Sequence, residues 1–246
     1  MSYFDFKLNT ALDARRAVEE FRAQRRCQVQ KVLPKELAVS VQGTLAHRTP
    51  WNYTYFDGTQ AQTIPLQTYA DLPDEARQSI TRQVMQTAQN GFAYSYNSFN
   101  FHQRFLAGEF PDHPLRELDV FLNGDDFLSF ARDLTGDREI SGSDASASWY
   151  GPNHFLNIHN DSGKGYDRRA AFVLNLTSEW RTNWGGELKF FSDRRGSRLE
   201  CAYFPGFNMI NVFAVPQYHA VGVVAPFAGG PRLSVSGWLY AGKAPY

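Results

Sequence analysis

Residues 146–161 read SASWYGPNHFLNIHND, and this stretch determines the fold that we expect. Two short runs rich in aromatic and branched residues, 146–150 and 155–160, are separated by a Gly-Pro-Asn cluster, which is typical of two strands joined by a turn. Four similar runs follow, at 170–176, 186–191, 208–213 and 232–240. Short strands at this spacing predict a sandwich or barrel.

The first half of the chain has a different pattern. Apolar residues recur at helical spacing over 10–24, 34–46, 72–88 and 115–135, and the last stretch breaks near Gly124. Two aromatic segments, 51–56 and 92–101, lie between these helices. The second alternates like a strand and then slips at Asn97–Ser98, which predicts a bulge or turn. Helices followed by strands indicate an α+β fold with a β-barrel core.

We expect residues 1–246 to form one domain, with a helix-rich support region over 1–140 and the barrel core over 146–240. Lysine plus arginine equals aspartate plus glutamate at 25 each, so the net charge gives no global reason to expect a nucleic acid or an anionic membrane as partner. Only two cysteines occur, and neither a leader peptide nor a long apolar run is visible. These features predict a cytoplasmic protein, and none of them indicates an oligomeric state.

A metal site is indicated by His159 and Asp161, which form an H-x-D. On an extended backbone, residues i and i+2 point to the same side, so the two side chains can share a cation. His219, 60 residues later and beyond Pro216, can provide a third ligand. Two histidines and a carboxylate leave other metal positions open, as non-haem iron(II) oxygenases require. We expect the other histidines to be structural: His47, His102, His113 and His154.

The tail, RLSVSGWLY at 232–240, alternates between polar and apolar residues. In one interpretation it is a half-buried strand whose polar side lies in water. In the other, the Arg232 side faces inward, where a guanidinium and a hydroxyl can bind a carboxylate. The strand alone does not decide between them.

Taken together and in this order, these motifs carry a family resemblance: Tyr150, Leu156, His159-x-Asp161, then Gly185-Gly186-Glu187-Leu188, then His219, then Arg232-x-Ser234 and Trp238. Over residues 146–240 the chain resembles the prolyl-hydroxylase branch of the 2-oxoglutarate and iron(II)-dependent dioxygenases. The interval from His219 to Arg232 is longer than is usual in that family, so the resemblance implies a longer turn there.

The resemblance implies a double-stranded β-helix, the jelly-roll catalytic core of this family. It implies that Fe(II) is bound by His159, Asp161 and His219, and that 2-oxoglutarate and O2 are cosubstrates, with ascorbate as an optional reductant. Arg232 would pair with the distal carboxylate of 2-oxoglutarate, assisted by Ser234, with Tyr150 nearby. Trp238 would pack against the floor of the pocket.

The function expected from this resemblance is hydroxylation of an unactivated C–H bond, foremost in a prolyl residue of a protein or peptide. A second hypothesis is hydroxylation of a free amino acid or another small metabolite. A third is a jelly-roll binding module without catalytic activity, because a fold does not determine a function. Iron uptake distinguishes the module from the enzymes, and an open groove distinguishes a peptide site from a metabolite site.

Overall fold

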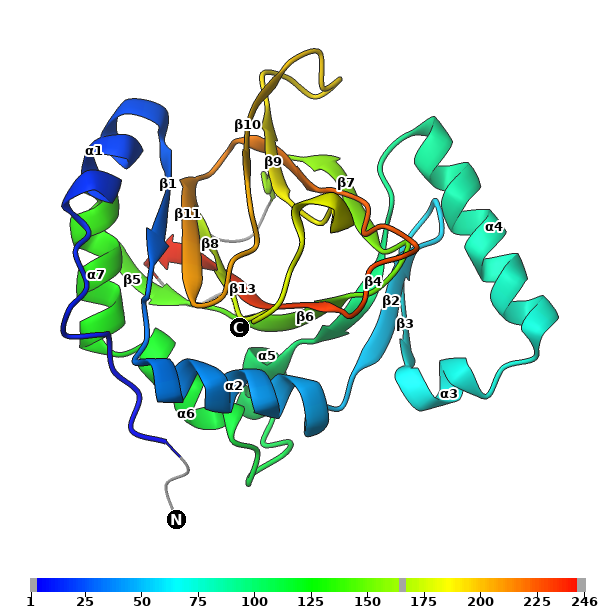
Figure 1. The fold of residues 1–246 in the computed structure, drawn as a ribbon, viewed down its shortest axis with the longest axis horizontal. Coiled ribbons are helices and arrows are strands. Elements are labelled where there is room, and N and C mark those ends of the chain that lie inside the picture. Colours follow the sequence, from blue (N-terminus) through cyan, green and yellow to red (C-terminus); the bar gives the residue numbers. More distant parts are fainter. Residues whose placement is uncertain (1–3, 164–166, 243–246) are drawn as a thin grey trace.

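The computed structural model describes residues 4–163 and 167–242, whose strands form one antiparallel network that curves around a central space (Figure 1). The hydrogen-bonded order is β1-β11-β8-β13-β6-β4-β7-β12-β9-β10, with β2, β3 and β5 attached to its side. The strands are β1 (Arg26–Gln30), β2 (Asn52–Phe56), β3 (Ala61–Pro65), β4 (Tyr94–Phe99), β5 (Ile140–Ser143), β6 (Ser146–Tyr150), β7 (Phe155–His159), β8 (Asp167–Asn175), β9 (Leu188–Phe191), β10 (Leu199–Tyr203), β11 (Met209–Ala214), β12 (Tyr218–Val221) and β13 (Arg232–Ala241).

The network has two layers that meet at β4. The C-terminal half of β4 pairs with β6 in the larger layer, whereas its N-terminal half pairs with β7 in the smaller layer of β7, β12, β9 and β10. This arrangement confirms the expected jelly-roll core with α+β composition.

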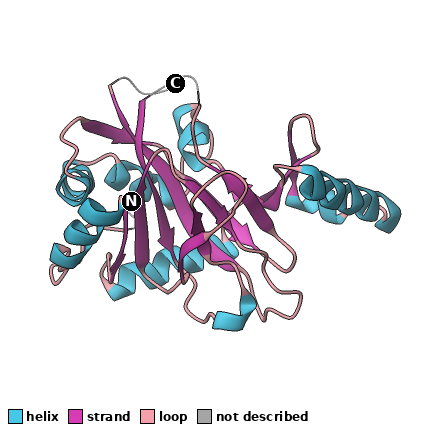
Figure 2. Ribbon diagram, turned by 90° about the horizontal axis from the view of Figure 1, so that it is seen from above, coloured by secondary structure: helices cyan, strands magenta, loops and turns pink. Residues whose placement is uncertain are grey.

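Helices cover the outer face of the larger layer. In Figure 1, α2 runs below β13 and β6, and α1 and α7 lie beside β1; Figure 2 shows that α4 stands apart, beyond the edge of the strands. The helices are α1 (Arg15–Gln24), α2 (Lys35–His47), α3 (Leu66–Ala70), α4 (Asp74–Asn90), α5 (Phe101–Leu106), α6 (Leu115–Leu122) and α7 (Asp125–Thr135), with a short 3-10 helix at Thr182–Trp184.

One hydrophobic core joins this helical layer to the barrel. It contains apolar residues of α2, α6 and α7 together with Leu233, Val235 and Leu239 of β13. This shared core supports our proposal that the support region and the barrel form a single domain. Among the described residues, no helix combines the length and apolar character needed to span a bilayer.

Strand β13 has both of its faces covered. Its apolar side lies in the core, and its polar side, with Arg232, Ser234 and Ser236, lines a cavity between the layers. Arg232 is only 1% exposed. The interpretation that places the polar side of this strand in water is therefore wrong.

The helices and the aromatic strands lie close to the residues where we expected them. The bulge expected at Asn97–Ser98 is absent from β4. β4 pairs with β2 in unbroken register and alternates up to Phe99, after which Phe101 begins α5. Phe101 therefore belongs to a helix, and its position in the aromatic pattern does not reflect strand alternation. The longer turn expected between His219 and Arg232 is present as residues 222–231.

Candidate metal and anion site

Two histidines come together because β7 and β12 are neighbours. His159 ends β7, His219 lies in β12, and the two residues are paired directly across the antiparallel ladder. Their ring centroids are 4.1 Å apart. Residues 60 positions apart in sequence thus become adjacent through strand register.

Asp161 completes the group by leaving the strand. Its φ of 58° lies in the left-handed region, so the extended backbone assumed for the H-x-D is wrong at this residue. The turn nevertheless brings its carboxylate to both rings: Oδ1 is 3.4 Å from His159 Nε2, and Oδ2 is 3.4 Å from His219 Nε2. One donor atom from each of the three residues lies within 4.8 Å of the others, which is close enough to surround a single cation.

Hydrogen bonds set the protonation of both rings. Nδ1 of His159 lies 2.9 Å from the carbonyl oxygen of Asn157, and Nδ1 of His219 lies 2.8 Å from that of Gln217. A carbonyl oxygen can only accept, so each Nδ1 carries a hydrogen. In the neutral rings, both Nε2 lone pairs are then directed to the centre of the group, as metal-binding histidines require.

The electrostatics of the group suit a cation. Burial alone would raise the pKa of the Asp161 carboxyl, but its contacts with His159 and His219 lower it to about 2. Burial and the neighbouring His159 lower the pKa of His219 to about 4. At neutral pH Asp161 is therefore a carboxylate and His219 is neutral, which are the states that bind metal.

A second contact layer holds Asp161 in place. Nη1 of Arg168 donates a 2.8 Å hydrogen bond to the carbonyl oxygen of Asp161, and its guanidinium carbon lies 3.8 Å from the centroid of the Trp238 ring. The side chain of Trp238 also helps to lower the pKa of the Asp161 carboxyl. Trp238 is fixed in turn by Asp144, whose Oδ1 accepts its backbone N–H at 2.8 Å. These contacts brace the left-handed turn.

The same cavity contains a buried cation. The cavity has a volume of about 870 Å3 and is lined by the three candidate ligands together with Arg232, Ser234 and Tyr150. Burial lowers the pKa of Arg232 to about 10, so the guanidinium remains charged at neutral pH. Within the described part of the chain, its Nε has no hydrogen-bond partner. A buried charge with an unsatisfied donor is the environment that an anionic ligand would complete.

Hydroxyl groups surround this guanidinium. Ser234 is hydrogen-bonded to Ser148 at 2.8 Å, and the guanidinium carbon of Arg232 lies 5.3 Å from the centroid of the Tyr150 ring. Tyr150 stacks on Tyr96 with centroids 4.7 Å apart, and burial raises the pKa of both phenols. The phenols therefore stay neutral and can donate hydrogen bonds inside the cavity.

The histidines interpreted as structural have local partners. His102 pairs with Asp119 at 2.7 Å, His113 bonds to the backbone near Arg48 and Leu115, and His154 accepts a hydrogen bond from the backbone N–H of Gly151. His47 is exposed at the end of α2.

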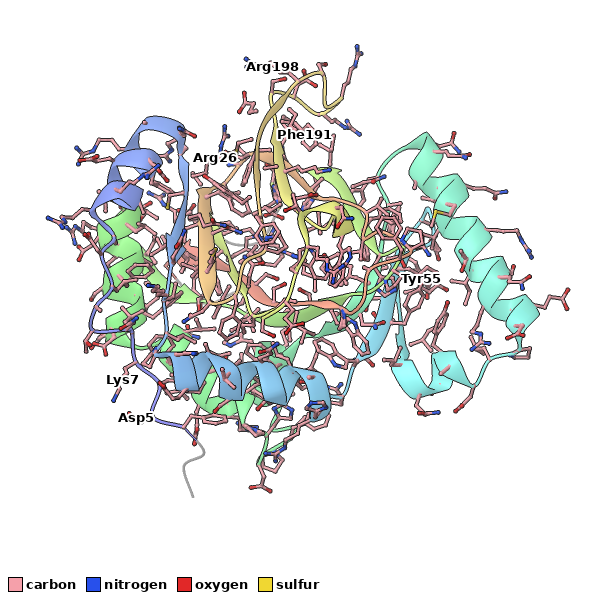
Figure 3. All side chains as sticks on the ribbon, in the orientation of Figure 1. Asp5, Lys7, Arg26, Tyr55, Phe191 and Arg198 are labelled. Carbon is pink, nitrogen blue, oxygen red and sulfur yellow. The ribbon has the colours of Figure 1, made fainter. Side chains whose placement is uncertain are left out.

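The arginines that follow His159 in the chain lie in two different environments. Arg194, Arg195 and Arg198 are exposed, and Figure 3 shows Arg198 at the tip of the β9–β10 hairpin, away from the ring of strands. Arg168, by contrast, lines the cavity. No sequence signal separated it from the surface arginines, because its position depends on the turn after His159.

The segment that carries this site is similar to a known protein family. Residues 145–240, which carry every candidate ligand, match the 2OG-Fe(II) oxygenase superfamily. The matched segment makes up less than half of the chain. The oxygenases of this superfamily use Fe(II), 2-oxoglutarate and O2, and the donor set and buried guanidinium fit a metal ion and an anion.

The chain is 32% identical over 121 residues to the prolyl 3-hydroxylase OGFOD1 of Xenopus laevis. The match covers 47% of this chain, and the chain spans only 23% of that protein's length.

Solved structures share the oxygenase fold. A prolyl-4-hydroxylase from Pseudomonas putida superposes with a TM-score of 0.54 at 16% identity, covering all of both chains. A 2OG-Fe(II) oxygenase family oxidoreductase from Burkholderia pseudomallei gives 0.56 at 14% identity, covering 96% of this chain and 93% of that one. A prolyl 4-hydroxylase from Phytophthora capsici gives 0.56 at 13%, covering 100% and 71%.

Proposed function

We propose that this chain is a 2-oxoglutarate-dependent iron oxygenase that hydroxylates an unactivated C–H bond, with a prolyl residue of a protein or peptide as its substrate. The observation that carries the proposal is the presence, in one cavity, of a three-donor cation site and a buried guanidinium with an unsatisfied N–H. A dicarboxylate 2-oxo acid is a ligand that can engage both.

In this proposal His159, Asp161 and His219 hold Fe(II). The chemistry that bound iron would supply is the activation of O2, with 2-oxoglutarate as the co-reductant. Asp161 supplies a negative charge that partly balances the metal, and the two imidazoles are held by backbone carbonyls in the tautomer that leaves Nε2 free to bind it.

The protein's remaining part is to bind and orient the cosubstrate. Arg232 is placed to pair with the distal carboxylate, with Ser234 as a hydroxyl partner and Tyr150 as a neutral donor in the same cavity. Burial strengthens such a charge-assisted contact because little water competes with it. Ascorbate would act only as an external reductant, and we assign it no residue.

A polypeptide substrate is supported by the Xenopus relative, which is named a prolyl 3-hydroxylase. A cavity of about 870 Å3 also holds more than a small 2-oxo acid. An exposed ring, Phe92, lies 5.8 Å from the His159 ring and offers an apolar surface beside the metal position. We therefore place the prolyl side of the substrate near Phe92.

The test has two steps. Under anaerobic conditions, addition of 2-oxoglutarate to the Fe(II)-loaded chain should produce the visible charge-transfer absorption of the chelate, and His159→Ala should abolish it. With O2, succinate release should then be measured with prolyl peptides and with free proline. Wild-type chain that takes up iron but gives no chelate spectrum would refute the oxygenase assignment, and stimulation by free proline but not by peptides would overturn the substrate.

A further inference from the structure

Arg232 has a neutral partner where a buried arginine usually has an acidic one. Its Nη2 donates a 3.0 Å hydrogen bond to Oδ1 of Asn175. Within residues 4–163 and 167–242 no carboxylate forms an ion pair with it. The negative charge of Glu187 raises the pKa of Arg232, but the Glu187 carboxylate forms its ion pair with Lys189, at 3.6 Å. The guanidinium charge is therefore left available.

The amide of Asn175 has a fixed orientation. Its Nδ2 faces two backbone carbonyls, of Val173 at 3.5 Å and of Met209 at 3.4 Å, which can only accept hydrogen bonds. The opposite atom, Oδ1, must then face Arg232. Because a flipped amide would direct its NH2 at the guanidinium, the two carbonyls select the orientation that accepts from Arg232.

Asn175 is also held rigidly by its strand. It lies at the end of β8, opposite Ser234 of β13 and Met209 of β11, and is completely buried. Three strands thus determine the position of its side chain. A contact from such a site restricts the rotamers of a long arginine side chain without neutralising it.

We propose that Asn175 is a positioning residue for cosubstrate selection: it directs the remaining N–H groups of Arg232 towards a distal carboxylate and, being neutral, preserves the full positive charge for that carboxylate. It thereby sets the preference for a dicarboxylate 2-oxo acid over one that lacks the second carboxylate. This inference rests on the proposed function.

The experiment measures equilibrium binding to the Fe(II)-loaded chain without O2, so it does not depend on turnover. 2-Oxoglutarate is compared with pyruvate, a 2-oxo acid that lacks the distal carboxylate.

Asn175→Ala should weaken 2-oxoglutarate binding by about ten-fold, the effect of losing one hydrogen bond to a charged group. Asn175→Asp should weaken it by about a hundred-fold or more, because a carboxylate beside Arg232 competes with the ligand for its charge. Pyruvate affinity should change by less than about two-fold in both variants, because only the distal carboxylate depends on Arg232.

The matched control is Asn211→Ala. Asn211 is equally buried on the adjacent strand β11, but its Oδ1 accepts from Gln28 and not from Arg232. It should leave the preference for 2-oxoglutarate over pyruvate unchanged while perturbing the interior to a similar extent. Asn175→Ala carries the test if the aspartate variant does not fold.

Unchanged 2-oxoglutarate affinity in Asn175→Ala, or an equal loss for both 2-oxo acids, would overturn the inference and leave the oxygenase assignment intact. Wild-type chain that binds iron but no 2-oxoglutarate would instead overturn the proposed function, and this inference with it.

Discussion

The two ends of the cavity hold charge in opposite ways. At the metal end, the Asp161 carboxylate lies between two imidazoles, on a turn that Arg168 braces from outside. At the other end, Arg232 lies at the start of a central strand, sealed from solvent and held by a neutral amide. Before a ligand arrives, the first end carries the negative charge of Asp161 and the second carries the positive charge of Arg232. We infer that each end is stabilised when an ion of opposite charge binds to it.

The largest expected effect comes from breaking the metal end. Asp161→Ala removes the only carboxylate of the group and should lower the affinity for Fe(II) or Co(II) by at least about a thousand-fold, because a metal ligand is lost outright. Metal titration monitored by calorimetry or by the Co(II) absorption measures this loss. The control is Asp193→Ala, at the exposed β9–β10 turn. Metal affinity within ten-fold of wild type would remove Asp161 from the site.

Replacing Arg232 should lower the affinity for 2-oxoglutarate but raise the stability of the metal-free chain. Arg232→Met should weaken 2-oxoglutarate binding by about a hundred-fold through loss of the charged contact. In the metal-free chain it should raise the free energy of unfolding by about 1–3 kcal/mol, because an incompletely compensated buried charge is replaced by an apolar side chain. Denaturant unfolding with and without the ligand measures both. A variant that is markedly less stable than wild type would show that Arg232 is structurally satisfied.

His154 lies outside the metal group, and the pH dependence of stability can show that it is a structural residue and not a ligand. Burial lowers the pKa of His154 from 6.5 to about 4. The unfolded chain takes up this proton at a higher pH than the folded chain, so the contribution of His154 to stability is complete above pH 6.5 and is lost as the pH falls towards 4. The expected loss is about 3 kcal/mol. Unfolding of the metal-loaded chain between pH 4 and 7 measures it.

His154→Gln should flatten this part of the pH profile while leaving metal affinity unchanged. If the profiles of wild type and variant run parallel, His154 is not the titrating group.

The smallest expected effect is on the brace of the metal end. Arg168→Met removes the hydrogen bond to the Asp161 carbonyl and should weaken metal binding by about ten-fold, in the range found for residues that orient ligands. Arg194→Met, on the exposed hairpin, is the matched control. An Arg168 variant with unchanged metal affinity would mean that the left-handed turn is stable without its brace.

Much of the site could be predicted from the sequence because its signals are local. The H-x-D and the short strands appear within windows of ten residues and led to His159 and Asp161, whereas the role of Arg232 was implied by the family resemblance. The strand beginning at Arg26 and the one containing His219 were not predicted as such.

The roles of Asn175 and Arg168 could not be found in this way. Asn175 appears in sequence as a polar residue ending an apolar run, and its contact with Arg232 exists only through the register of β8 on β13. Arg168 reaches Trp238 across a turn and a strand pair. Contacts of this kind are set by tertiary structure and leave no periodic trace in the chain.

Strand β13 pairs with β5, β6 and β8 and separates the hydrophobic core from the cavity. Val235, on its core side, has no solvent exposure, while its neighbours Ser234 and Ser236 line the cavity. Truncation of the Val235 side chain would leave a cavity in the core. The backbone that positions those hydroxyls would then shift to fill this cavity. Substitutions that impair this protein should therefore occur among the core residues behind β13, which touch no ligand, as well as among the residues around the cation.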